Sequence, residues 1–96
     1  MTKLKNIVQS PVFAKQKKKL HKQQINDLDI AVKALFHNPA LGELKRGDLQ
    51  TILIYKFKMK NQHLLLAYEV VGSSLFLYTF GSHENFYRDL KNYLHH

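Results

Sequence analysis

The chain has 96 residues, a length that suits one small domain with a single hydrophobic core. It carries 15 Lys and Arg against 7 Asp and Glu, so its formal net charge at pH 7 is +8. The basic N-terminus lacks the apolar run of a signal peptide, no stretch suits a membrane span, and the absence of cysteine excludes disulfides and thiolate zinc sites. We therefore expect one domain over residues 1–96, in the cytoplasm and without a membrane partner. The positive charge favours a nucleic acid or an acidic protein as partner, the alternative being a charged surface that only keeps the protein soluble.

The first half of the chain predicts a short strand followed by two helices. The strand is expected over Leu4 to Gln9, and Ser10-Pro11 then offers an N-cap followed by proline at the first helical position. A second helix is expected from about Gln24 to His37, where Asn38-Pro39 ends it. Because the connection between the helices is short, they should form an antiparallel hairpin.

Lysines of the first helix form a regular pattern. The spacing i, i+3, i+4 and i+7 places four of them on one face of a helix that extends through them all: Lys15, Lys18, Lys19 and Lys22. Such a stripe suits binding to RNA or to the ribosome. A solvated helix face is the alternative.

The second half predicts an antiparallel meander of three strands and a final helix. Between Ile52 and Met59, alternate residues face a core, while Lys56 and Lys58 lie together on the other face. The remaining strands span His63 to Val71 and Leu75 to Phe80, after which Gly81-Ser82-His83 opens the helix. A loop is expected from Ala40 to Asp48. With its helices gathered on one side of a small, mainly antiparallel sheet, the domain is of the α+β class.

Four residues of this half could support metal-free RNA cleavage: Lys56, Lys58, His83 and Tyr87. The reaction needs a base for the ribose 2′-hydroxyl, cations that hold the phosphate, and an acid for the leaving oxygen. No metal and no other cofactor is expected, because the histidines and carboxylates lack metal-site spacing and no phosphate-binding glycine loop occurs. The alternative places the two lysines on the solvent face of a strand and Tyr87 in the core.

The chain resembles the RelE/ParE superfamily of bacterial type II toxins over nearly its whole length. Four segments carry the resemblance: Leu44-Lys45-Arg46-Gly47-Asp48, Tyr55-Lys56-Phe57-Lys58, Ala67-Tyr68-Glu69-Val70, and Phe80-Gly81-Ser82-His83 with Tyr87 after it. The resemblance implies a microbial-RNase-like fold with an N-terminal helical hairpin and a C-terminal helix. It also implies that Lys56, Lys58, His83 and Tyr87 occupy the cleft of a ribosome-dependent RNase.

One position departs from the family pattern. The family's catalytic arginine lies three residues before the strand tyrosine that Tyr68 matches, and this position holds Leu65. Arg46, in a glycine-flanked loop, is the expected substitute, and Arg88 is the less favoured one.

We therefore predict a toxin that cleaves mRNA in the ribosomal A site, a metal-independent endoribonuclease. Lys45 and Arg46 join the four helical lysines as expected contacts to RNA or the ribosome. The resemblance implies a cognate acidic antitoxin that forms a hetero-oligomer with the toxin. Three alternatives stay open: a ParE-like inhibitor of DNA gyrase, a non-catalytic RNA-binding module, and a degenerate toxin that still binds its antitoxin.

Overall fold

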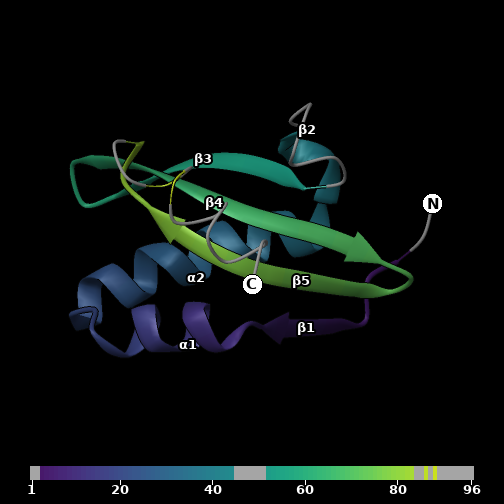
Figure 1. The fold of residues 1–96 in the computed structure, drawn as a ribbon, viewed down its shortest axis with the longest axis horizontal. Helices are drawn as coiled ribbons and strands as arrows, with labels where there is room; N and C mark the ends of the chain where they lie inside the picture. Colours follow the sequence, from purple (N-terminus) through teal and green to yellow (C-terminus); the bar gives the residue numbers. More distant parts are fainter. Residues whose placement is uncertain (1–2, 45–51, 84–85, 87, 89–96) are drawn as a thin grey trace.

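The computed structural model describes residues 3–44, 52–83, 86 and 88 (Figure 1). Their elements follow the predicted order, with two short elements added where a loop was predicted. These elements are β1 (Asn6–Gln9), α1 (Pro11–Lys18), α2 (Lys22–His37), the 3₁₀ helix η1 (Pro39–Leu41), β2 (Glu43–Leu44), β3 (Leu53–Met59), β4 (Gln62–Val71) and β5 (Ser74–Gly81). The strands form one five-stranded sheet in the order β1-β5-β4-β3-β2. The pair β1–β5 is parallel and the other pairs are antiparallel. The predicted α+β class is confirmed.

The two helices form the expected hairpin, but α1 is shorter than predicted. Ser10 is the N-cap of α1, and its Oγ accepts a hydrogen bond from the Phe13 backbone N–H at 3.0 Å. The helix ends at Lys18, and a new helix begins after His21, whose N–H donates to Gln24 Oε1 at 2.9 Å. An ion pair of 3.1 Å between Lys17 and Asp29 joins the helices.

The lysine stripe is therefore not a feature of one helix, and that prediction was wrong. The backbone N–H of Lys19 and Leu20 bond back only three residues, which tightens the last turn and lets the chain reverse before Lys22. Lys15 and Lys18 lie on α1, Lys19 is its C-cap, and Lys22 starts α2. The signal for this break is the Gln24 side chain, which stabilises a new helix start at His21.

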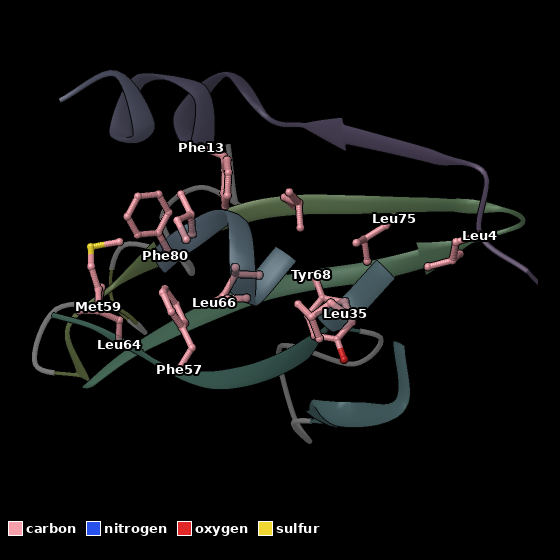
Figure 2. Close-up of a cluster of buried hydrophobic side chains, with 13 residues drawn as sticks. Leu4, Phe13, Leu35, Phe57, Met59, Leu64, Leu66, Tyr68, Leu75 and Phe80 are labelled. Carbon is pink, nitrogen blue, oxygen red and sulfur yellow. The ribbon is translucent and has the colours of Figure 1, made fainter. Parts of the chain in front are cut away.

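The main core lies between the helices and one face of the sheet (Figure 2). Phe13 of α1 meets Phe80 of β5 edge to face, with ring centroids 5.1 Å apart. From α2, Leu28 and Leu35 are completely buried in the same core. Phe57 and Met59 of β3 face it as predicted, so Lys56 and Lys58 must lie on the opposite face, which we call the outer face.

A buried tyrosine joins the sheet to the segment after α2, where the sequence predicted only a loop. Tyr68 of β4 donates a hydrogen bond from Oη to the Pro39 carbonyl at 2.6 Å and accepts one from the Gly42 N–H at 2.8 Å. Burial raises the pKa of Tyr68 above its usual 10.0, so the hydroxyl stays protonated at neutral pH and keeps both bonds. These bonds hold η1 in place, and β2 follows it as an edge strand paired with β3.

The Gln16 side chain of α1 takes the place of a strand along the last part of β5. Its amide nitrogen donates to the Phe80 carbonyl at 2.8 Å, and its Oε1 accepts from the Phe80 N–H at 3.2 Å and from Thr79 Oγ1 at 3.1 Å. The pairing of β1 with β5 ends at Gln9, so Gln16 satisfies backbone groups that β1 does not reach. This contact supports the last part of β5, which ends at Gly81.

We expect Gly42→Ala to destabilise the fold. A Cβ at this position would lie 2.6 Å from Tyr68 Cε1 and 2.9 Å from Cζ, so the ring or the loop must move. Forced repacking of this kind lowers the free energy of unfolding by about 1–3 kcal/mol. Urea denaturation measures the change. Gly81→Ala is the control, because a Cβ there meets nothing within 4 Å and should leave the midpoint nearly unchanged.

Candidate functional site

Lys56 and Lys58 are both exposed on the outer face of β3, one pleat apart. The side chains of alternate strand residues project from the same face at a spacing of about 7 Å. The register of β3 with β4 sets their neighbours: Leu65 is opposite Lys56, and His63 is opposite Lys58. Directly opposed residues have Cβ atoms about 5 Å apart, so His63 shares a surface with both lysines.

Leu65 is buried in a second apolar cluster, which covers the middle of the outer face. Only 3% of its surface is exposed, and it packs with Ile54, Ala67 and Phe86. Ile52 completes this cluster, and Tyr78 packs against it. The outer face thus has an apolar half around Leu65 and a basic half at the Lys58–His63 pair.

The segment after β5 turns toward the same face. Gly81 is the strand partner of Leu65, and the Phe86 N–H then donates to the Ser82 carbonyl at 3.1 Å, as in the first turn of a helix. Phe86 is buried in the cluster on the outer face, which is the side of the sheet opposite to α1 and α2. Most of the C-terminal helix that the sequence predicts lies outside the described residues.

His83 is exposed and follows Gly81 by two residues. If β5 continued straight, residue 83 would be opposite His63, so the sheet brings the start of this segment to the basic half of the outer face. Three predicted site residues lie outside the described residues: Lys45, Arg46 and Tyr87. Arg88, the second candidate to replace the missing arginine, is exposed.

The structure separates the helical lysines from Lys56 and Lys58. Lys15, Lys18, Lys19 and Lys22 are all exposed, but they belong to the helical hairpin, whose core side covers the other face of the sheet. The predicted site residues that the structure describes therefore fall into two groups on opposite sides of the sheet. Within the described parts of the chain, no three His, Asp or Glu side chains come together as a metal site would require.

His63 is the residue that sequence reasoning did not assign to the site. The sequence does contain an indication that His63 is opposite Lys58. Lys60 and Asn61 form a two-residue turn, and such a turn pairs residue 58 with residue 63. Lys60 adopts a φ of 56°, and its N–H donates to Asp27 of α2 at 2.7 Å. A lysine with positive φ is not a typical turn residue, so the turn could not be located to the residue from composition.

Comparison with known proteins identifies the class. A family model described as the ParE-like toxin of type II bacterial toxin–antitoxin systems matches residues 7–91. The chain belongs to this family of bacterial toxins. No curated protein matches it closely in sequence.

Solved toxins share the fold. An arginine double mutant of E. coli RelE in the free state has a TM-score of 0.66 at 18% identity, over 96% of this chain and 98% of that one. YafQ from E. coli has a TM-score of 0.63 at 18% identity, over 84% of this chain and 96% of that one. RelE in the intact E. coli RelBE toxin–antitoxin complex has a TM-score of 0.63 at 18% identity, over 79% of this chain and 93% of that one. No helix in the described residues is long and apolar enough to cross a membrane.

We expect Leu65→Arg to destabilise the protein, even though it would restore the arginine of the family pattern. The new guanidinium would enter the apolar cluster around Phe86, and burying an unpaired charge costs several kcal/mol. Thermal and urea unfolding should both show the loss. Leu65→Met is the control, since a similar apolar volume usually costs less than about 1.5 kcal/mol. An arginine variant as stable as the wild type would show that the outer cluster can open at this position.

Proposed function

We propose that this toxin is a metal-independent endoribonuclease that cleaves mRNA on the ribosome. The observation that carries the proposal is the pair Lys56 and Lys58, exposed side by side on the outer face with an imidazole directly opposite. Two lysines at strand positions about 7 Å apart can hold the oxygens of one phosphodiester and stabilise the charge that develops on them during cleavage. The fold that this chain shares with RelE and YafQ agrees with this proposal.

In the proposed reaction, the ribose 2′-oxygen attacks the adjacent phosphorus and the bond to the 5′-oxygen breaks, which leaves a 2′,3′-cyclic phosphate. Lys56 and Lys58 bind the phosphate, and His83 and Tyr87 complete the site. Histidine changes its charge near neutral pH, so His83 can protonate the leaving oxygen. Tyrosine can stack on a base or orient the phosphate, which is the role proposed for Tyr87.

Leu65 makes a second candidate function worth testing. Its side chain is buried where the family pattern has an arginine, so it cannot bind phosphate. Losing one preorganised donor costs about 10²–10³ in rate unless another cation replaces it, and Arg46 is our candidate for that replacement. A toxin fold that retains only RNA or antitoxin binding is the alternative that the apolar cluster favours.

The proposed partner is an acidic antitoxin that binds across the basic surface in a hetero-oligomer. The net charge of +8 supplies long-range attraction for such a chain. The E. coli RelBE structure is that of a toxin–antitoxin complex, which offers a precedent on the same fold. Lys45, Arg46 and the helical lysines are proposed to contact RNA or the ribosome.

Replacing Lys56 and Lys58 by alanine should abolish mRNA cleavage and growth arrest without unfolding the protein. Both side chains are exposed, and surface substitutions usually change stability by less than about 0.5 kcal/mol. Primer extension on translated mRNA after brief induction measures the cleavage. Lys5→Ala with Lys33→Ala removes the same charge elsewhere and should keep full activity. Cleavage by the Lys56/Lys58 variant would contradict the proposed site, and inhibited DNA supercoiling without cleavage would identify a gyrase inhibitor.

Replacing Lys15, Lys18, Lys19 and Lys22 together by glutamine should weaken ribosome or RNA binding without changing the cleavage sites. Each lysine that neutralises a phosphate contributes about 0.7–0.9 to the slope of log K against log salt, so the slope should fall by about 3. Binding measured between 50 and 300 mM KCl tests this. An unchanged slope would mean that these lysines serve solubility alone.

A further inference from the structure

The basic half of the outer face contains three cationic or titratable side chains on two neighbouring strands. Lys56 and Lys58 come from β3, and His63 comes from β4 directly opposite Lys58. All three are exposed, and the opposed pair is within reach of a single phosphodiester and its ribose. The two-residue turn at Lys60-Asn61 sets the register that brings His63 to this place.

Of these three side chains, His63 is the one whose chemistry suits proton transfer. Lysines remain charged at neutral pH, whereas imidazole exchanges a proton between pH 5 and 8. The next carboxylate along β4 is Glu69, six residues away or about 20 Å along the strand, where it accepts a hydrogen bond from Tyr78 at 2.6 Å. Glu69 is therefore too distant to act as the base beside Lys56 and Lys58.

We propose that His63 is the general base that accepts the proton of the ribose 2′-hydroxyl, an inference that rests on the ribonuclease activity proposed above. Neutral His63 takes this proton as the 2′-oxygen forms its bond to phosphorus. The bond between phosphorus and the 5′-oxygen breaks, and that oxygen receives a proton from an acid, the role given to His83. The products are a 2′,3′-cyclic phosphate and a free 5′-hydroxyl, with one proton taken up and one released.

The strand pairing shows which charged groups lie around His63. Lys58 and Lys56 face it from β3, and His83 belongs to the segment that leaves β5 at this end of the sheet. Asp27 of α2 accepts a hydrogen bond from the hairpin turn at the Lys60 N–H, on the core side of the sheet.

The test compares His63→Gln and His63→Ala with the wild type in a reconstituted translation reaction, over pH 5.5–8.5. Wild-type cleavage should follow a bell-shaped pH profile, rising on the acidic side as His63 loses its proton and falling on the alkaline side as His83 loses its own. His63→Gln should lower the rate about 10²–10⁴-fold and remove this acidic limb. Added imidazole should restore cleavage to His63→Ala. His37→Gln is the matched control, because His37 is also exposed but ends α2, and it should keep the wild-type rate and profile.

Three results would overturn the assignment. One is a His63→Gln variant with the wild-type rate and pH profile. Another is a His63→Arg variant that keeps full activity, since a guanidinium can bind phosphate but stays protonated and cannot act as the base. The third is a wild type that cleaves no mRNA, which also overturns the proposed function. If the Lys56/Lys58 double variant loses cleavage while His63→Gln keeps it, the role of His63 is rejected and the proposed ribonuclease activity stands.

Discussion

The register of the β3–β4 hairpin is the constraint on which the site depends. A two-residue turn at Lys60-Asn61 sets it, and Asp27 of α2 holds that turn through the Lys60 N–H. Because strand side chains alternate between faces, a slip of one residue would move Phe57 and Met59 out of the core and both lysines into it. The apolar core therefore enforces the register, and the register in turn places His63 opposite Lys58. The positions of the site residues are therefore set by the packing of the core on the other face of the sheet.

The outer face of this small sheet has an apolar part and a basic part next to each other. Its middle is apolar and covered by Phe86, while its end presents lysines and imidazole to solvent. Leu65 belongs to the apolar half, although its strand partner is Lys56. The position where the resemblance leads us to expect an arginine is thus part of the packing around Phe86. Chemistry on this face would have to come from the groups at its exposed end.

Two polar side chains hold the ends of the sheet. The Gln16 side chain forms the hydrogen bonds that a neighbouring strand would otherwise make with Phe80. These bonds fix the point where the chain leaves β5 before His83. Tyr68 binds η1 through the Pro39 carbonyl and the Gly42 N–H, at the opposite end of β4 from His63. Both side chains satisfy backbone groups that would otherwise be buried without partners, so their contribution is mainly the avoided cost of desolvation. They position the elements around the site without belonging to it.

Local patterns in the sequence determined much of this protein. The alternation around Phe57, the Ser10-Pro11 helix start and the stop at Asn38-Pro39 predicted the elements, because each depends on the geometry of a few neighbouring residues. The same patterns placed Lys56 and Lys58 on one exposed face. The same patterns gave a wrong prediction for the four lysines, because a regular spacing of charges is present whether or not the helix continues. The residues that end the helix are harder to recognise in the sequence.

Tertiary structure decided the rest, because it depends on contacts between distant residues. The short strand β2 exists only through pairing with β3, and Gln16 meets Phe80 only because α1 folds back along β5. The pairing of His63 with Lys58, and the burial of Leu65 beneath Phe86, follow from strand register and from which face each element covers. Composition does not fix the residue at which the hairpin turns, and spacing does not record which face Phe86 covers. The sequence by itself determined which residues could do chemistry, and the sheet decided which of them stand together.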